Sequence, residues 1–329
     1  MTKLQYILGV DIGGTKCAVV LGNYNANGEK EVNILDKIRF ATETHKGVQY
    51  TIDKIIESVD TIIKINNLTT IDIYSIGISC GGPLDSKKGI IMSPPNLAGW
   101  DNIPIVDILE KRFGIRTLIQ NDANACALAE WKFGAARGYQ NVIFLTFGTG
   151  MGAGLILNGR LYSGTNDMAG EIGHIRFENS GPVGYGKQGS FEGFCSGGGI
   201  AQLAMTKVLE KLQMGEKVSF CESIDKLSGM NAKIIANAAD AGDELALEIY
   251  KISGSYLGRG LSILIDILNP EIIVIGSIFL RSMDLLWHAA EEVIERETLS
   301  YAKKVCKVVP DGLGDKLGDL AALAVALNI

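Results

Sequence analysis

The sequence lacks close cysteine pairs and long apolar runs. No two of its cysteines are nearer than 26 residues, which excludes CxxC metal knuckles and gives no disulfide framework. Buried free thiols are the expectation. No window approaches the 18 uncharged apolar residues of a membrane span, and the first residues show no signal-peptide pattern. These absences predict a cytoplasmic protein. The cysteines are Cys17, Cys80, Cys126, Cys195, Cys221 and Cys306.

An excess of basic residues is also missing. The 31 Lys and Arg face 37 Asp and Glu, for a net charge of −6, which argues against a nucleic-acid partner. Glycine is abundant, with 40 of 329 residues, so many backbone positions need positive φ or a close approach. A chain of this length suits two domains.

Apolar periodicity predicts an α/β protein with two glycine hairpins. Strands are expected at 6–11 and 17–21 and again at 142–147 and 153–157, each pair around a glycine turn. Apolar residues spaced by three or four predict a helix over 48–66. Further helices are expected at 104–113, 125–133, 198–212, 232–240, 243–268, 283–297 and after 319, with strands near 34–40, 71–79, 115–119, 271–275 and 305–309.

The two hairpins resemble each other at a constant offset of 136 residues. Gly14 aligns with Gly150, and apolar positions match on both arms. A repeat this long indicates a duplicated domain, and chance similarity between two hairpins is the alternative. Two such hairpins can hold one polyphosphate between them.

The turn from Asp11 to Lys16 is the first candidate site. Adjacent glycines let backbone N–H groups point together at an anion, and Lys16 can reach a phosphate. Asp11 can hold Mg²⁺ through water. An ordinary hairpin turn is the alternative, because Gly-Gly is a common turn pair.

Asp122 stands where a predicted strand meets a predicted helix, a favoured place for sites in α/β folds. A helix N-cap is the alternative, and the two roles are compatible. Glu171, His174 and Glu192 stand near or within a glycine-rich segment that ends at Glu192. Glu171 and Glu192 can accept hydrogen bonds from sugar hydroxyls, although each of the three residues alone is more often a surface or structural residue.

Taken in order, these motifs resemble the ROK family (repressor, open reading frame, kinase) from residue 6 to about 326. The resemblance rests on DIGGTK (11–16), GGPLD (81–85), NLAGW (96–100), NDANA (121–125), FGTGMGAGLILNG (147–159), GEIGH (170–174), GSFEG (189–193) and a late GD-x-A (318–321). It implies the sugar kinase, Hsp70 and actin superfamily fold: two duplicated actin-like, ribonuclease-H-like α/β domains with a cleft between them. We expect domains at 1–119 and 120–316, with a C-terminal helix at about 317–329 packing back on the first.

The resemblance also implies roles for individual residues. Asp122 resembles the catalytic base. Asp11, Gly13, Gly14, Thr15, Lys16, Thr149, Gly150 and Gly276 resemble the ATP-binding positions, Asp11 also being a candidate Mg²⁺ ligand through water. Asn96, Asn121, Asp122, Glu171, His174 and Glu192 resemble the sugar-binding positions.

The chain departs from the family pattern in three places. Val183, Tyr185 and Ser190 stand where the family usually has zinc-binding cysteines, so we expect no structural zinc. No helix-turn-helix precedes residue 6, which argues against a repressor. Ser277 follows Gly276 where two glycines are usual, which weakens the expected adenosine contact.

The implied reaction is transfer of the ATP γ-phosphoryl group to a hexose, with the 6-OH of glucose first among the candidates. N-acetylmannosamine and N-acetylglucosamine remain alternative substrates. A sugar-sensing regulator without catalysis is the alternative of another class, and a chaperone-like or filament-forming ATPase is a third. The family resemblance implies a homodimer.

Overall fold

A computed structural model of the protein describes residues 4–25 and 31–328. Contacts divide the chain into two compact units, which we treat separately. This division groups residues 120–140 with the first unit, whereas the expected domain boundary falls after residue 119. Unit 1 comprises Met1–Gln140, Gly154–Ala169 and Gly312–Ile329, and unit 2 comprises Asn141–Ala153 and Gly170–Asp311.

Unit 1 is built on a five-stranded mixed sheet. Strand β1 pairs antiparallel with β2 and parallel with β4, and β7 is parallel to β4. The carboxyl ends of parallel strands meet at one edge, so Asp11 and Asn121 share that edge. The strand order is β3 (Val32–Ala41), β2 (Lys16–Asn25), β1 (Leu4–Ile12), β4 (Ile73–Cys80) and β7 (Thr117–Asn121).

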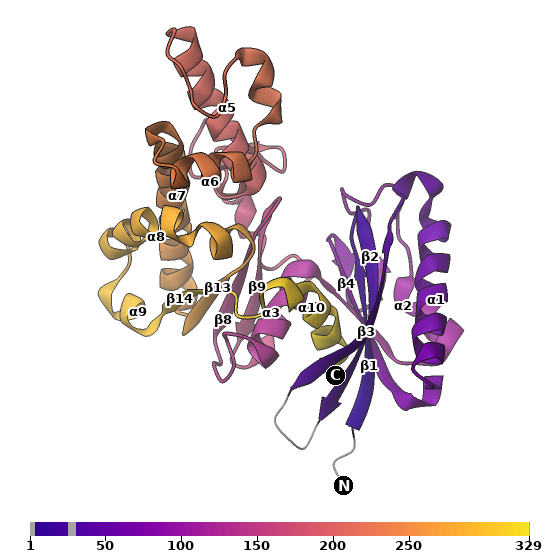
Figure 1. The fold of residues 1–329 in the computed structure, drawn as a ribbon. Coiled ribbons are helices and arrows are strands. Elements are labelled where there is room, and N and C mark those ends of the chain that lie inside the picture. The colour runs from indigo at the N-terminus through magenta and orange to yellow at the C-terminus, as the bar shows by residue number, and fades with distance from the viewer. Residues whose placement is uncertain (1–3, 26–30, 329) are drawn as a thin grey trace. The chain divides into compact units, whose positions relative to one another are not determined.

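Helix α1 (Val48–Ile65) covers one face of this sheet (Figure 1). Its side chains Ile52, Ile55 and Val59 are buried in one apolar cluster with Leu8 and Val10 of β1. The spacing of three and four residues therefore predicted this helix correctly. Removing such an isoleucine side chain from a packed core typically costs about 2–5 kcal/mol.

Helix α10 (Leu317–Ala326) covers the opposite face and packs on β1 and β4 (Figure 1). A Cβ atom placed on Gly77 would lie 2.2 Å from the Ala322 carbonyl oxygen. Only glycine permits this approach of helix to strand. All ten α10 residues except the first three are buried.

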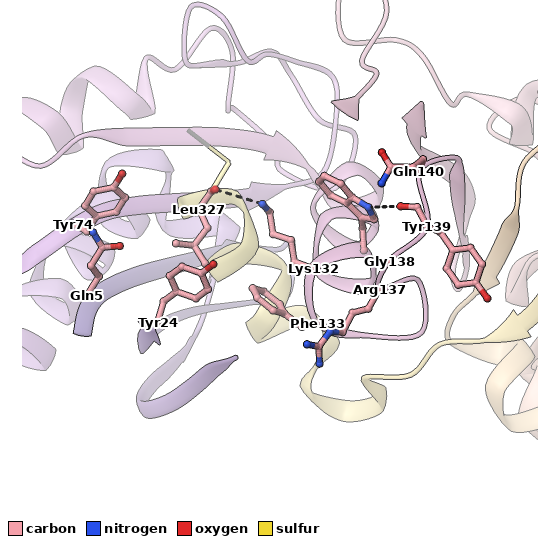
Figure 2. A pocket seen from close by; sticks show the side chains of 11 residues that line it. Gln5, Tyr24, Tyr74, Lys132, Phe133, Arg137, Gly138, Tyr139, Gln140 and Leu327 are labelled. Carbon is pink, nitrogen blue, oxygen red and sulfur yellow. Dashed lines mark hydrogen bonds between the residues drawn. The ribbon is translucent and has the colours of Figure 1, made fainter. Parts of the chain in front are cut away.

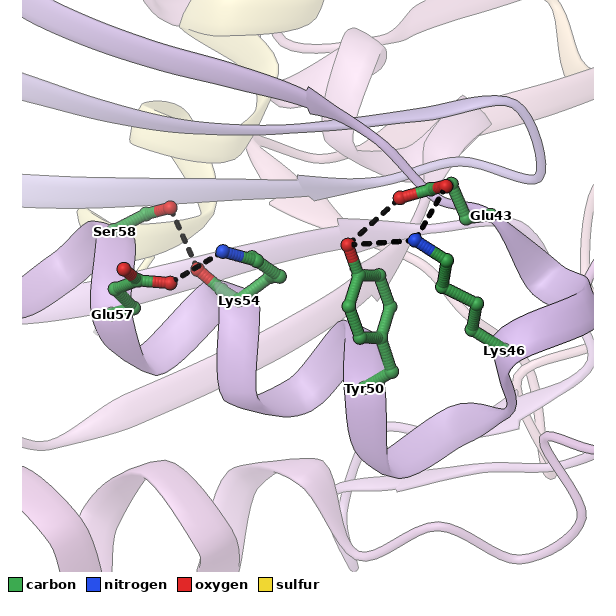
Figure 3. Close-up of polar contacts among 6 residues, drawn as sticks. All are labelled: Glu43, Lys46, Tyr50, Lys54, Glu57 and Ser58. Carbon is green, nitrogen blue, oxygen red and sulfur yellow. Dashed lines mark hydrogen bonds and ion pairs between the residues drawn. The ribbon is translucent and has the colours of Figure 1, made fainter.

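A polar cluster fixes the corner before α1 (Figure 3). The Tyr50 hydroxyl donates to Glu43 at 2.8 Å, and Lys46 forms an ion pair with the same carboxylate at 2.8 Å. The Lys46 ammonium beside Glu43 lowers the pKa of that carboxyl. Such exposed pairs stabilise a protein little, so the cluster orients the corner more than it stabilises the fold.

The remaining elements of unit 1 are short or lie beside the candidate site. Helix α3 follows β7 without a loop, which places its first turn at the carboxyl edge of the sheet. The segments are β5 (Leu84–Asp85), β6 (Ile90–Ile91), α2 (Ile105–Phe113) and α3 (Asp122–Phe133).

A second sheet repeats the arrangement of the first. Its order, β10-β9-β8-β13-β14, matches β3-β2-β1-β4-β7, with a hairpin followed by parallel strands in both. This equivalence supports the duplication inferred from the 136-residue offset. The strands are β8 (Val142–Phe147), β9 (Met151–Leu157), β10 (Arg160–Leu161), β13 (Ile272–Ile275) and β14 (Lys307–Pro310).

Unit 2 is otherwise mostly helical, and its longest helices, α7 and α8, pack against each other. Ser282 has non-helical backbone angles, which separates the first turn of α8 from the helix expected to begin at residue 283. Across the described residues, we find no helix with the length and apolar character needed to span a bilayer. The elements are β11 (Val183–Gly184), β12 (Lys187–Gln188), α4 (Phe191–Phe194), α5 (Gly197–Gln213), α6 (Ala232–Asp240), α7 (Glu244–Leu268), α8 (Ile278–Glu297) and α9 (Ser300–Val305).

Candidate functional site

The turn between β1 and β2 is a closed hairpin turn with an exposed tip. The Gly13 amide donates to the Lys16 carbonyl at 3.1 Å, which closes the turn. The side chains of Thr15 and Lys16 are exposed. A Cβ atom on Gly14 would lie 2.2 Å from the Asn96 carbonyl oxygen. The loop therefore needs glycine here, and it brings the candidate sugar ligand Asn96 against the candidate phosphate loop.

Asn121, and not Asp122, caps helix α3. Its side-chain oxygen accepts a hydrogen bond from the Asn124 amide at 2.7 Å. Asp122 occupies the first helical position, and its carboxylate remains accessible to solvent. Since Asn121 performs the capping role, the Asp122 carboxylate is available for chemistry. Asp122 is exposed as a residue, but partial burial of its carboxyl group still raises the pKa of that carboxyl, and hydrogen bonds from the Ala123 and Asp122 amides oppose the change.

Asp11 lies among other carboxylates. Loss of hydration raises the pKa of Asp11 to about 6, and the negative charges of Asp319 and Asp122 add to the effect. The cations of Lys16 and Lys37 oppose it. Lys37 also forms an ion pair with Asp319 at 2.5 Å. A cation beside Asp11 would favour its ionised form.

The residues around Asp11 suit a magnesium ion that has few protein ligands. No group of three or more His, Cys, Asp or Glu side chains within residues 4–25 and 31–328 is arranged to hold a metal ion. Mg²⁺, however, binds through one or two carboxylates, its own waters and substrate phosphates. Asp11 is therefore a suitable single protein ligand for a magnesium ion that arrives with a nucleotide.

The second hairpin, in unit 2, holds Glu192 directly. The Gly148 amide donates to the Gly150 carbonyl at 3.1 Å, which closes the turn. The Met151 amide donates to the Glu192 carboxylate at 2.9 Å. A Cβ atom on Gly150 would lie 2.8 Å from the same carboxylate. The exposed Thr149 stands at the tip of this turn.

A short 3₁₀ turn at Ile172–His174 follows Glu171 and ends at His174, and both of these residues are exposed. A Cβ atom on Gly173 would lie 2.2 Å from the Met151 carbonyl oxygen, so this turn packs closely on the start of β9. The His174 ring meets the Tyr185 ring edge-on at 6.3 Å. These contacts orient the turn.

Hydrogen bonds anchor the glycine-rich loop that precedes Glu192. The Gln202 side chain accepts from the Val183 amide and donates to the Val183 carbonyl, both at 2.9 Å. The Lys187 ammonium donates to the His174 carbonyl at 2.7 Å. Ser190 caps helix α4 by accepting from the Gly193 amide at 3.1 Å. The absence of structural zinc stays a prediction, which metal analysis of the purified protein would test.

A cavity of about 820 Å³ lies in unit 2 beside the second hairpin. Gly148 and Thr149 line it together with Gly197 and Gly198, the first residues of helix α5. Amides at the start of a helix have no partner within the helix and bind anions. The sequence analysis missed the other lining residues, because they come from separate helices. These include Asn231, Lys233, Asn237 and Arg281.

Ser277 lines this cavity, and Gly276 does not. A Cβ atom on Gly276 would lie 3.0 Å from the Phe144 ring, so packing explains this glycine. Ser277 has a φ of 61°, which favours glycine over any residue with a Cβ atom. Ser277, which stands where the family usually has a second glycine, therefore has a strained backbone conformation.

The expected site residues thus form one group in each unit. Unit 1 brings together the first hairpin, Asn96, Asn121 and Asp122, and unit 2 brings together the second hairpin, Glu171, His174 and Glu192. Each group holds one glycine hairpin and at least one acidic side chain. The pattern of two equivalent hairpins is what the sequence repeat predicted.

Comparison with known proteins agrees with this geometry. The sequence profile of the ROK family matches residues 7–329. A glucokinase from Halalkalibacterium halodurans is 33% identical over 297 residues, which cover 90% of this chain and 87% of that protein. A xylose repressor from Caldicellulosiruptor bescii is 28% identical and is matched over 98% of this chain and 78% of its own length.

A solved structure gives the same result. A ROK family glucokinase from Streptomyces griseus, in complex with glucose and AMPPNP, superposes with a TM-score of 0.75. The two sequences are 28% identical, and the match covers 98% of this chain and all of that one. The fold is the mixed α/β fold of the ROK sugar kinases, which is actin-like. The chain belongs to the ROK family.

Proposed function

We propose that this protein transfers the γ-phosphoryl group of ATP to a hexose hydroxyl, with the 6-OH of glucose as the first candidate. The observation that carries the proposal is the pairing of Asn121 with Asp122 at the start of α3. Asn121 caps the helix, and Asp122 keeps an accessible carboxylate at the carboxyl edge of the sheet. The glucokinases among the relatives support the same reaction class.

In this reaction Asp122 accepts the proton of the attacking hydroxyl. The sugar oxygen forms a bond to the γ-phosphorus while the bond to the leaving ADP oxygen breaks. Such transfers depend mainly on positioning and on offsetting charge at the phosphate oxygens. Lys16 supplies positive charge, and the candidate donors are turn amides other than those of Gly13, Gly148 and Met151, which already have partners. Mg²⁺, when bound, neutralises phosphate charge, and Asp11 is the residue that would hold it through water.

The nucleotide assignment uses the remaining ATP-binding candidates. Gly13, Gly14 and Thr15 are the phosphate-binding candidates of unit 1, and Thr149 and Gly150 are those of unit 2. The cavity of about 820 Å³ beside Thr149 is large enough for a nucleoside. Gly276 then acts through packing beside Ser277, without contacting the adenosine.

The sugar assignment gives each candidate ligand a hydrogen bond to a hydroxyl. Asn96 and Asn121 are the candidates in unit 1, and Glu171, His174 and Glu192 are those in unit 2. The side-chain oxygen of Asn121 caps the helix, so the side-chain NH₂ group is the part that can donate to a sugar hydroxyl. N-acetylmannosamine and N-acetylglucosamine remain alternative acceptors.

Replacing Asp122 with Asn tests the base. We expect sugar binding to change little and kcat to fall by about 10²–10⁴-fold, the usual effect of removing a general base. Asp107→Asn is the matched control, because Asp107 is an exposed carboxylate on α2. Near-normal turnover of a well-folded Asp122→Asn protein would remove Asp122 from this role.

A screen for ADP release over hexoses and N-acetylhexosamines tests the substrate. Turnover with one sugar supports the kinase and identifies its acceptor. Sugar binding without ADP release from any acceptor would instead favour the sugar-sensing regulator, a class to which the xylose repressor among the relatives belongs by its name. Light scattering and cell fractionation would test the expected cytoplasmic homodimer.

A further inference from the structure

An ion pair joins the edge of the first sheet to the start of helix α10. The Lys37 ammonium, on β3, lies 2.5 Å from one carboxylate oxygen of Asp319 and 2.6 Å from the other. The two side chains are 27% and 15% exposed, so water and salt screen this pair less than they screen a pair at the surface. Both residues belong to unit 1, and neither is among the candidate ligands of the sugar or the nucleotide.

Strand pairing places Lys37 and Asp11 on the same face of the sheet. Gly9 pairs with Val20 of β2, and Val20 pairs with Lys37 of β3. Paired residues on neighbouring strands share a face, and so do residues two apart on one strand, which adds Asp11 to this face. Helix α10 covers the same face, because a Cβ atom on Gly9 would lie 2.9 Å from the Ala322 side chain. The sheet and the helix thus direct Lys37, Asp11 and Asp319 to one layer of unit 1.

Lys37 and Asp319 both act on the Asp11 carboxyl. Burial raises the pKa of Asp11, the negative charge of Asp319 raises it further, and the positive charge of Lys37 lowers it. Both charges therefore lie within electrostatic range of the residue proposed to hold magnesium. The Lys37 ammonium nevertheless pairs with Asp319 and not with Asp11.

A lysine close to a magnesium ligand competes with the metal for its negative charge. The lysine ammonium is a compact point charge on a flexible stem, so Lys37 can turn toward either carboxylate. While Asp319 is charged, turning Lys37 toward Asp11 would leave the Asp319 carboxylate without its partner in a partly buried place, which is costly. Without the charge of Asp319, this cost disappears and the attraction of Lys37 to Asp11 remains.

We propose that Asp319 is a positioning residue for the magnesium–nucleotide complex: by pairing with Lys37, it keeps that ammonium from competing with Mg²⁺ for Asp11. The inference rests on the proposed function, since it takes Asp11 as the residue that holds Mg²⁺ through water. Asp319 acts through Lys37, and its contribution is the balance of charge around Asp11.

Helix α10 has other contacts that keep it in place when this ion pair is removed. Residues 320–326 of the helix are buried. Just beyond its end, the Lys132 ammonium contacts the Leu327 carbonyl oxygen at 3.5 Å (Figure 2). Asn has nearly the same size and shape as Asp, so Asp319→Asn removes the charge with little change in packing. Thermal unfolding of each variant checks that the fold is retained.

Calorimetry with a non-hydrolysable ATP analogue, repeated over a series of free Mg²⁺ concentrations, tests the inference on the full chain. Asp319→Asn should raise the Mg²⁺ concentration that gives half of the maximal nucleotide affinity by about tenfold, since one close charge changes the cation affinity of a carboxylate by at least that factor. Lys37→Met removes the competitor and should leave this concentration unchanged or lower it. The double variant of Lys37→Met and Asp319→Asn should return to the wild-type value. Asp60→Asn is the matched control, because it removes a carboxylate from the exposed Arg112–Asp60 pair of the same unit.

Rescue in the double variant is the result that separates charge balance from a purely structural role. If Asp319→Asn, Lys37→Met and the double variant all weakened Mg²⁺-dependent binding, the pair would serve only to join β3 to α10, and the inference would be wrong. An unchanged Mg²⁺ requirement in Asp319→Asn, or nucleotide binding that does not depend on Mg²⁺ in the wild type, would also overturn it. Turnover with any of these results counts against this inference alone. Nucleotide binding with the expected pattern but without turnover of any sugar counts against the proposed function, and the absence of nucleotide binding counts against both.

Discussion

The Glu192 carboxylate accepts a hydrogen bond from the Met151 amide at 2.9 Å. This bond ties a candidate sugar ligand to the hairpin proposed to hold phosphate, within one unit. We therefore expect the two proposed ligand sites to influence each other through the Glu192 side chain.

Glu192→Ala should raise the KM for both sugar and ATP. The variant loses a hydroxyl acceptor and also the bond that holds the hairpin, and bonds to charged groups contribute about 1.5–3 kcal/mol. Each KM should rise about tenfold. Glu192→Gln keeps an oxygen for the Met151 amide and should change the ATP KM little. If Glu192→Ala changed only the sugar KM, the proposed connection between the sugar site and the second hairpin would be wrong.

Asp11→Asn should stabilise the magnesium-free protein at neutral pH and abolish turnover. The pKa of Asp11 is raised from 3.8 to about 6, so ionisation of this carboxyl opposes folding. The stabilising contribution of this carboxyl is therefore complete below about pH 4 and is lost as the pH rises through about 6. Removing the charge should raise the free energy of unfolding by on the order of 2 kcal/mol at about pH 7.5 and should leave it almost unchanged near pH 4.

Urea unfolding of wild type and Asp11→Asn at both pH values measures this difference. Asp107→Asn, on the exposed side of α2, should show no such dependence. An equal gain at both pH values would mean that burial of the Asp11 charge is not its cause.

Gln202→Ala should loosen the loop before Glu192. The variant loses both bonds to Val183, and the next residue, Gly184, packs against Glu192, where an added Cβ atom would lie 2.7 Å from the Glu192 Cβ atom. We expect a loss of about 1 kcal/mol in stability and a severalfold rise in the sugar KM, with little change in kcat.

Gln202→Glu separates the two bonds, since a carboxylate accepts from the Val183 amide and does not donate to its carbonyl. Its sugar KM should lie between those of wild type and Gln202→Ala. Gln213→Ala, at the exposed end of the same helix, is the control. An unchanged sugar KM in both Gln202 variants would show that the loop is positioned by other contacts.

Ser277→Gly should increase stability. Ser277 has a φ of 61°, a conformation that costs a residue with a Cβ atom on the order of 1 kcal/mol. Glycine removes that cost and adds some entropy to the unfolded chain, so the net gain should be about 0.5 kcal/mol. Ser255→Gly, inside helix α7, should instead lose a similar amount. Thermal unfolding of Ser277→Gly and Ser255→Gly measures both changes. A loss of stability in Ser277→Gly would contradict the inference that the Ser277 backbone is strained.

Local patterns predicted most of the fold because the forces that produce them are local. The apolar spacing around Ile52 determines helix α1, and the glycines of the two hairpins determine the turns. The role of Asn121 was not predictable, because Asn121 and Asp122 are equally good caps by type and only side-chain geometry separates them. The role of Gln202 also escaped prediction, since its bonds to Val183 join residues that only folding brings near.

Helix α10 has a consequence for the order in which the chain is made. The sheet of unit 1 comes from residues 4–121, but one of its faces is covered by a helix from residues 317–326. Residues 141–311, which contain all of unit 2, leave the ribosome in between. Unit 2 can therefore fold during synthesis, whereas the first sheet must wait with Gly77 and its neighbours uncovered. The half that is translated first is completed last.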